Sequence, residues 1–238
     1  MARGVVAAAA VAMLALAAQA SGGARAGAAC PASLANQLAD TRAATQLITV
    51  VAASQRSSTA SLRRWRKSGD CWLAVGPAAT AHVGRNGVSE AKREGDKRTP
   101  AGAFGIQSVM YGVGPNPGVR YPYRRIVCGD WWVEDPRSPF YNRFKHVRCG
   151  STPPFRITSE DMSRSPTSYR HLAVIDYNAH PIVPGRGSGI FLHVSASGGP
   201  TLGCVSLPYA QLVATLRWLQ PTATPLIVIG TAARIRDY

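Results

Sequence analysis

The stretch FLHVSASGGPTLGCVSLP, from Phe191 to Pro208, is the most informative part of this sequence for the fold. The run Gly189–Val194 predicts a buried strand with His193 near its end, because it is short, apolar and rich in strand-forming residues. A turn of small residues and proline, 195–200, then reverses the chain. We expect the chain to return antiparallel, so that the side chains of His193 and Cys204 meet.

A cysteine and a histidine in this arrangement suit nucleophilic catalysis. The thiolate is the nucleophile, and a nearby imidazole can take the proton of the thiol. Gly203 lets the backbone approach a substrate, and the N–H groups of Gly203 and Cys204 are candidate donors to a developing oxyanion. The alternative is that Cys204 is a buried, inert thiol beside a structural histidine.

The chain has five cysteines, so at least one is left unpaired. If Cys204 is free, the other four can pair in three ways. Cys128 and Cys149 flank a segment rich in Pro, Trp and Tyr, and each is followed by a glycine that suits a turn. We predict the disulfides Cys128–Cys149 and, by remainder, Cys30–Cys71.

The first residues have the pattern of a secretory signal peptide. A short basic start is followed by the apolar run Val5–Ala18 and by the small-x-small site Ala18–Ala20. Later small-x-small sites follow at Ala24–Ala26 and Ala26–Ala28. We predict that residues 1–26 are removed and that the protein is secreted or held in the cell wall. The apolar run is short for a membrane span, so an uncleaved anchor is a weaker alternative, as is a buried helix. A lipid anchor on Cys30 is also less favoured, because no bulky aliphatic residue precedes it closely.

The formal net charge is +15, from 27 Lys and Arg against 12 Asp and Glu. A strongly basic protein favours polyanionic partners such as nucleic acid, teichoic-type polymers or anionic lipid. No nucleic-acid module signature accompanies the charge. For an exported protein we therefore expect anionic envelope polymers rather than nucleic acid as partners.

Residues 27–46 read as a connector or short helix, and 47–238 as one mostly β domain. We expect a β-sandwich or barrel with one or two short helices, over Thr59–Lys67 (ended by Gly69) and Gln211–Leu219. Asn86-Gly87 predicts a two-residue hairpin turn. Besides Gly189–Val194, strands are predicted at Leu47–Ala52, Cys71–Val75, Ala81–Val83, Phe104–Ile106, His171–Tyr177 and Leu226–Ile229.

From about 111 to 167 no periodicity is clear, and Pro, Gly, Trp, Tyr and Arg dominate. A segment of this length without a regular pattern indicates a functional insertion. Its aromatic residues Trp131, Trp132, Tyr121 and Tyr123 could stack on sugar rings, but packing inside the insertion is the favoured interpretation.

We expect neither a metal nor another cofactor. A zinc site needs His with Asp, Glu or Cys at ligand spacing. The remaining histidines, His82, His146, His171 and His180, are scattered along the chain.

Two patches resemble one known family. LHVSASGGPTLGCVSLP resembles the His…(Ser/Thr)-x-Gly-Cys signature of the L,D-transpeptidase catalytic domain, with its YkuD-like fold. EGDKRTPAGAFGI, 94–106, resembles the Gly-x-x-x-Thr-Pro-x-Gly-x-Phe segment of that family. The resemblance covers about 47–230 and implies a YkuD-like β-sandwich. The matching residues of the second patch are assigned no catalytic role: Gly95, Thr99, Pro100, Gly102 and Phe104.

By this resemblance Cys204 is the nucleophile, His193 its base and Gly203 the oxyanion-hole glycine, while Thr201 fills the small-hydroxyl position. The neutral tautomer of His193 would be held by a backbone carbonyl or by the hydroxyl of Thr201.

The residues on either side of the cysteine, Leu202 and Ser206, are assigned to substrate binding. Ser206 stands where the family usually has Arg or Asn, and the spacing from His193 to Cys204 is shorter than usual. The first difference bears on substrate affinity, and the second indicates a trimmed loop over the site.

The implied substrate is a peptidoglycan tetrapeptide stem, and a monomer is expected. Cys204 would attack the carbonyl of its diaminopimelate-type third residue and release D-alanine. An amine of a second stem would resolve the thioester into a 3→3 crosslink. Two alternatives stay open: an L,D-carboxypeptidase that uses water, and a non-catalytic basic protein that binds the envelope.

Overall fold

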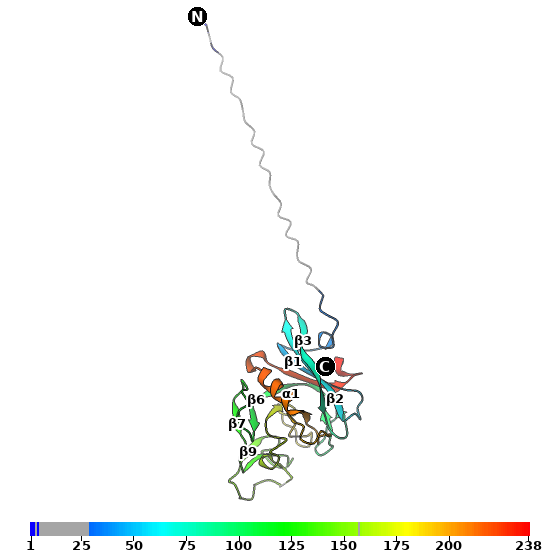
Figure 1. Ribbon diagram of the computed structural model, residues 1–238, viewed down its shortest axis with the longest axis vertical. Coiled ribbons are helices and arrows are strands. Elements are labelled where there is room, and N and C mark those ends of the chain that lie inside the picture. The colour runs from blue at the N-terminus through cyan, green and yellow to red at the C-terminus, as the bar shows by residue number, and fades with distance from the viewer. Residues whose placement is uncertain (3, 5–28, 157) are drawn as a thin grey trace.

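The computed structural model describes residues 1, 2, 4, 29–156 and 158–238 (Figure 1). The apolar run and the cleavage site of the predicted signal peptide lie outside the described residues. Among the helices of the described part, none has the length and apolar character that a membrane span needs.

A nine-stranded sheet dominates the fold, which confirms the expected mostly β class (Figure 1). The strand β11 at one end of the sheet also pairs with β6 near the other end, so the sheet curls over and encloses a core. This architecture is consistent with a YkuD-like sandwich. In spatial order the strands are β11 (Leu172–Ile175), β12 (Phe191–Val194), β13 (Val205–Leu207), β3 (Cys71–His82), β2 (Thr59–Ser68), β1 (Gln46–Ala52), β14 (Leu226–Thr231), β6 (Gly102–Gly112) and β7 (Tyr123–Arg125).

The central strands β1 and β14 are buried on both faces. Ile48 and Ile227 belong to the main core inside the curled sheet, whereas Leu47 and Val228 pack into a second cluster on the other side. A strand that is covered on both faces reads as a continuous apolar run, which is why the sequence revealed both strands.

One α-helix, α1 (Tyr209–Trp218), follows β13 and buries Leu212 and Leu216 in the main core, close to the predicted helix at 211–219. The other short elements are η1 (Ala35–Gln37), β4 (Val88–Ser89), β5 (Thr99–Pro100), η2 (Met162–Arg164), η3 (Pro221–Ala223) and η4 (Ile235–Asp237).

The helix predicted at 59–67 is wrong, because this segment is the strand β2. Its buried residues Ala60 and Leu62 alternate as in any strand. Leu62 packs into the main core, whereas Trp65 packs into the second cluster on the other side of the sheet. Residues three apart on a strand point to opposite faces, and both faces of β2 are covered here. Burial on both faces therefore gave the false helical spacing, while the irregularity in the pairing with β3 adds its extra residues on β3.

Two further predictions change. The segments 71–75 and 81–83 are one long strand, β3, which pairs with β2 through the turn at Gly69. Asn86-Gly87 does form a turn, but it does not connect a hairpin, because β4 pairs in parallel with β5 rather than with β3.

The insertion at 111–167 holds a small sheet of its own, in the order β10 (Glu160–Asp161), β8 (Asp130–Trp132) and β9 (Phe144–His146). Trp132 is buried and meets Phe191 of β12 edge-on, with 5.1 Å between ring centroids. Tyr121 is buried in the main core. These aromatic rings therefore attach the insertion to the large sheet.

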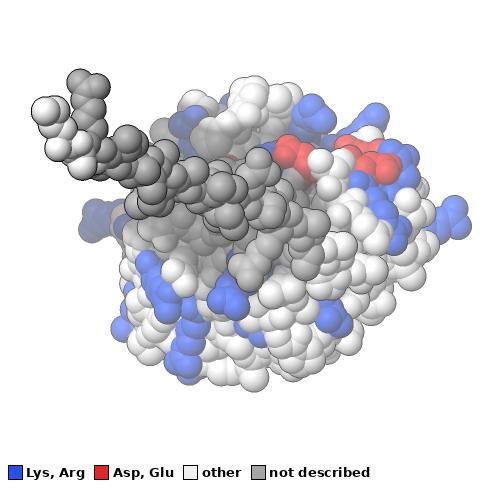
Figure 2. Space-filling view, turned by 90° about the horizontal axis from the view of Figure 1, so that it is seen from above, with Lys and Arg blue, Asp and Glu red and all other residues white. Residues whose placement is uncertain are grey.

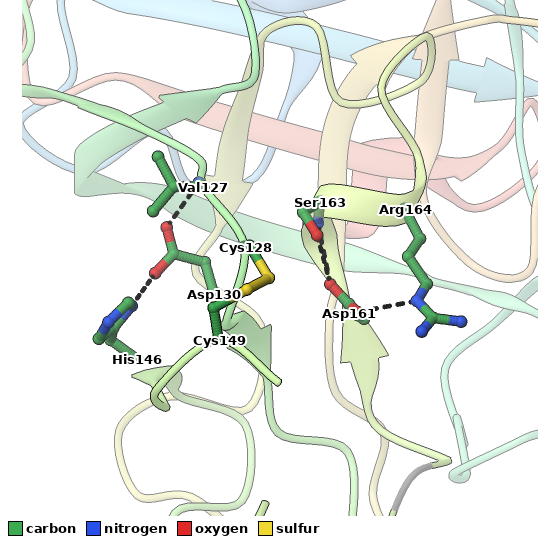
Figure 3. Close-up of a disulfide and its surroundings, with 8 residues drawn as sticks. All are labelled: Val127, Cys128, Asp130, His146, Cys149, Asp161, Ser163 and Arg164. Atoms are coloured by element: carbon green, nitrogen blue, oxygen red, sulfur yellow. Dashed lines mark hydrogen bonds and ion pairs between the residues drawn. A yellow bond between two sulfur atoms is a disulfide. The ribbon is translucent and has the colours of Figure 1, made fainter. Parts of the chain in front are cut away.

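Both predicted disulfides are present. Cys128–Cys149 closes the start of the insertion (Figure 3), and Cys30–Cys71 ties the segment before β1 to the start of β3. Cys204 is the free cysteine of the described residues.

Beside the disulfide of the insertion lies a fully buried carboxylate, Asp130 (Figure 3). It accepts hydrogen bonds from the backbone N–H of Val127 at 3.0 Å, from Nδ1 of His146 at 2.7 Å and from the guanidinium of Arg124 at 3.3 Å. A buried charge needs such partners, because desolvation would otherwise disfavour the folded state.

We predict that Asp130→Ala lowers the free energy of unfolding by about 2 kcal/mol, because it removes three hydrogen bonds to a buried charged group. Denaturant unfolding followed by tryptophan fluorescence would measure the change. Asp40→Ala is the matched control, since the Asp40 carboxylate is exposed and its pair with Arg42 should contribute below about 0.5 kcal/mol. Equal losses in the two variants would contradict this role of Asp130.

Candidate active site

The strands that carry the candidate residues, β12 and β13, run parallel, with His193 opposite Ser206. The expected antiparallel return is therefore wrong. The chain leaves the end of β12, crosses over in a short loop and re-enters the sheet in the same direction. Cys204 thus comes just before the start of β13, while His193 lies on β12 itself.

Both side chains line one cavity of about 360 Å³. The structure places every residue predicted for catalysis or substrate binding at this cavity, although in different settings. Leu202 is exposed at the rim, whereas Ser206 is almost completely buried below the cavity. The residues predicted for catalysis or substrate binding that line this cavity are Cys204, His193, Gly203, Thr201, Ser206 and Leu202.

The thiol of Cys204 is held by backbone groups. It accepts the N–H of Phe191 at 3.3 Å and donates to the carbonyl of Gly189 at 3.2 Å. No hydrogen bond in the described part of the chain joins it to His193. Burial raises the pKa of the thiol to about 12, and the nearby carboxylates Glu160 and Glu134 act in the same direction. The resting thiol is therefore protonated at neutral pH.

His193 is neutral and oriented. Its Nδ1 donates to the carbonyl of Val194 at 2.8 Å, so Nε2 carries no proton and is free to act as a base. The backbone carbonyl thus holds the tautomer, and the hydroxyl of Thr201 does not. Tyr169 meets the imidazole edge-on, with 5.6 Å between ring centroids. Burial lowers the pKa of His193 to about 4.

Thr201 closes the turn before the cysteine. Its hydroxyl donates to the carbonyl of Cys204 at 2.6 Å and accepts the N–H of Gly203 at 3.1 Å. Gly203 has φ = +148°, and a Cβ there would press on the carbonyl of Arg98 at 3.1 Å. Only glycine adopts this conformation without strain.

Thr99 is a positioning residue to which sequence reasoning gave no site role. It is fully buried, accepts the N–H of Gly84 at 2.8 Å and lies 3.4 Å from the carbonyl of Cys204 as a second donor. The Thr-Pro motif was the available signal, since it matched a segment otherwise assigned to structure alone.

Three carboxylates of the cavity wall, Glu94, Glu134 and Glu160, were also missed, as was the buried Lys92. In a chain with 12 acidic against 27 basic residues, such a grouping is unusual. Figure 2 shows the prevailing charge: basic side chains are spread over the face in view, and acidic ones are confined to one region. Two of the three glutamates come from the insertion, whose sequence gave no pattern that places them.

No group of three or more metal-ligating side chains occurs in the described residues. The histidines outside the cavity have other surroundings: His146 contacts Asp130, His171 contacts Tyr123, His180 lies near Asp176, and His82 lies on β3. The cavity chemistry described here uses only protein groups.

Comparison with known proteins assigns the chain to a family. Searches of curated proteins and of solved structures returned no match. A sequence model of the YkuD family, described as the L,D-transpeptidase catalytic domain, matches residues 46–228. This span contains the free thiol, the oriented imidazole and the Thr-Pro motif. The chain therefore belongs to the YkuD family of L,D-transpeptidase catalytic domains.

Proposed function

We propose that this protein is a cysteine acyltransferase that acts on peptidoglycan stem peptides, forming 3→3 crosslinks. The observation that carries the proposal is the pairing, in one cavity, of a free thiol with an oriented imidazole whose Nε2 has no partner in the described residues. Membership in the YkuD family supports the substrate class.

In the first half-reaction Cys204 attacks the carbonyl of the third residue of a tetrapeptide stem. Nε2 of His193 takes the thiol proton as the carbon–sulfur bond forms. The bond to the terminal D-alanine then breaks, and the imidazolium gives its proton to the leaving amine. Because both groups start neutral, proton transfer accompanies the attack instead of preceding it.

The tetrahedral intermediate needs donors for its oxyanion. The N–H of Gly203 is already used by Thr201, so we assign this role to the N–H of Cys204 and keep Gly203 as the residue that lets the turn form. The two threonine hydroxyls on the Cys204 carbonyl fix the peptide plane that precedes Val205.

In the second half-reaction an amine of another stem attacks the thioester carbon. The new C–N bond forms, the C–S bond breaks, and His193 passes the proton of the amine to the sulfur. Attack by water in the same position would give an L,D-carboxypeptidase.

We propose that the protein works outside the cytoplasm as a monomer, after removal of residues 1–26, with 27–46 as a connector and 47–238 as the catalytic domain. The two disulfides support an oxidising compartment. The charge of +15 supports contact with anionic envelope polymers.

The direct test is mass spectrometry of a disaccharide-tetrapeptide incubated with the protein and, separately, with Cys204→Ala. We expect loss of D-alanine and a crosslinked dimer with the protein, and neither product with the variant. Tripeptide without dimer would replace the proposal by a carboxypeptidase. No product from folded protein would favour an envelope-binding protein without turnover.

The raised pKa of Cys204 predicts slow alkylation of the free enzyme. A thiol with a pKa of about 12 has far less thiolate at pH 7 than an ordinary thiol of about 8.5, so iodoacetamide should react at least about 100-fold more slowly than with N-acetylcysteine. The rate should rise about tenfold per pH unit between pH 7 and 9. A fast rate that is already level at pH 7 would instead indicate a preformed thiolate.

Substitutions at Thr201 test whether its hydroxyl group positions Cys204 for the reaction. Thr201→Val removes both hydrogen bonds of the turn and should slow thioester formation at least about tenfold, since the nucleophile and oxyanion donor shift together. Thr201→Ser keeps the hydroxyl and should stay within about threefold of the unmodified protein. Rates of acyl-enzyme formation, read by intact mass, decide the matter, and equal rates in the two variants would argue against this role.

A further inference from the structure

One wall of the cavity carries three carboxyl groups that the proposed acyl transfer does not use. Glu134 follows β8, Glu160 begins β10, and Glu94 lies in the loop before β5; all three line the cavity. Two of these three side chains are thus delivered by the insertion, and they face the side of the cavity that holds Cys204.

The charges nearby are already paired. Glu94 accepts hydrogen bonds from the hydroxyls of Tyr141 and of Ser188, the latter at 2.7 Å. Lys92 is buried and bound to Asp96 at 2.7 Å, and its ammonium group also lies near enough to Glu134 and Cys204 to oppose part of the rise in the pKa of each. Lys97, the other cation of the lining, is exposed at the rim.

Glu134 is free by comparison, since no hydrogen bond or ion pair in the described residues reaches its carboxyl group. Glu160 is loosely held: it accepts a long hydrogen bond from Ser165 at 3.4 Å, and burial raises its pKa, a rise that the nearby hydroxyl of Tyr169 opposes as a second donor. The carboxylate of Glu134 also lies directly against Gly189, since a Cβ at that glycine would collide with Oε1. The carbonyl of the same Gly189 accepts the thiol of Cys204.

A second observation points to a ligand in this space. His193 lines the cavity and is 8% exposed, and its Nε2 has no hydrogen-bond partner in the described chain and is not sealed from solvent. An imidazole nitrogen and a half-buried carboxyl group that both lack protein partners leave hydrogen-bonding capacity for a ligand. The same two groups are complementary to a molecule that brings a carbonyl centre and a cation together.

We propose that Glu134 and Glu160 form a subsite for a primary ammonium group of the stem peptide. The proposal rests on the proposed function, acyl transfer on peptidoglycan stem peptides. It identifies the ammonium group as the feature of the substrate that the two glutamates recognise. The ammonium group can come from the side chain of the acyl donor or from the acceptor amine, and the chemistry of recognition is the same in both cases. Charge-assisted hydrogen bonds to a desolvated carboxylate provide the affinity.

Each source has a distinct consequence. A donor ammonium offsets the two negative charges that oppose ionisation of the Cys204 thiol, so substrate binding itself assists the attack. An acceptor ammonium must lose a proton before it attacks. Burial, aided by Glu160 and Glu94, raises the pKa of Glu134 to about 8, so this carboxyl group is largely protonated in the empty site at neutral pH. A bound ammonium group favours its ionised form, and the carboxylate can then take the proton to give a neutral amine and a carboxylic acid.

Binding tests the subsite without turnover. In a Cys204→Ala background, calorimetry would compare a tetrapeptide stem that carries a free side-chain ammonium with the same stem acetylated on that amine. We expect the free amine to bind at least about tenfold more tightly. The preference should fall below about threefold when Glu134→Gln or Glu160→Gln is added, and should persist with Glu90→Gln, a matched loss of charge at a residue that does not line the cavity.

Turnover separates the two sources. If the donor supplies the ammonium, acetylating the donor should slow thioester formation, and Glu134→Gln should slow it only for the free amine. If the acceptor supplies it, Glu134→Gln should leave thioester formation unchanged. Transfer to a charged amine should then fall at least about tenfold, while transfer to hydroxylamine, which is uncharged at neutral pH, is preserved.

The outcomes for the subsite and for the proposed function are distinguishable. Absence of thioester with every donor would refute the acyltransferase, but the ammonium preference in the Cys204→Ala background would still decide the subsite. No preference, or a preference that both Gln variants keep, would overturn the subsite even if crosslinks form. Gln is isosteric with Glu and replaces a half-buried carboxyl group that is costly to ionise, so these variants should fold, and circular dichroism would check it.

Discussion

The structure around the cavity depends on the two hydroxyl groups that converge on the carbonyl of Cys204. Thr201 reaches it from within the turn, and Thr99 reaches it from a segment more than a hundred residues earlier. The chain passes from β12 to its parallel neighbour β13 through a short loop. These hydrogen bonds hold Cys204 in a fixed position at the end of that loop. The same hydroxyl of Thr201 accepts the N–H of Gly203, whose positive φ and close contact with the Arg98 carbonyl explain why that position requires glycine.

The sequence predicted the parts of this arrangement that follow from local chemistry. The free cysteine followed from disulfide arithmetic, the two disulfides from turn residues and remainder, and β14 from its apolar run. Prediction from the sequence failed where contacts between residues far apart in the chain determine the local structure. Burial of Leu62 and Trp65 on opposite faces of β2 imitated helical spacing, and a parallel crossover was taken for an antiparallel return. The acidic wall could not be predicted, because Glu134 and Glu160 reach the cavity only when the insertion packs against the large sheet near Gly189.

Cys204 and His193 do not form a thiolate–imidazolium ion pair in the free protein. His193 is neutral because it is buried, and the thiol of Cys204 is protonated for the same reason, reinforced by two carboxylates. The free protein thus keeps an unreactive thiol, which protects a lone cysteine in a compartment where disulfides form. Reactivity in such a site depends on what enters it, so the groups that shape the entry matter as much as the nucleophile.

The insertion has an architecture of its own: a small sheet, a disulfide and the buried Asp130 that joins three partners beside it (Figure 3). Cys204 and His193 belong to the large sheet, whereas two of the acidic residues belong to this braced unit. The thiol–imidazole pair and most of the acidic wall are therefore encoded in separate stretches of the gene. Exchange of the insertion alone would change the charge that lines the cavity, while His193 and Cys204 keep their places on the large sheet.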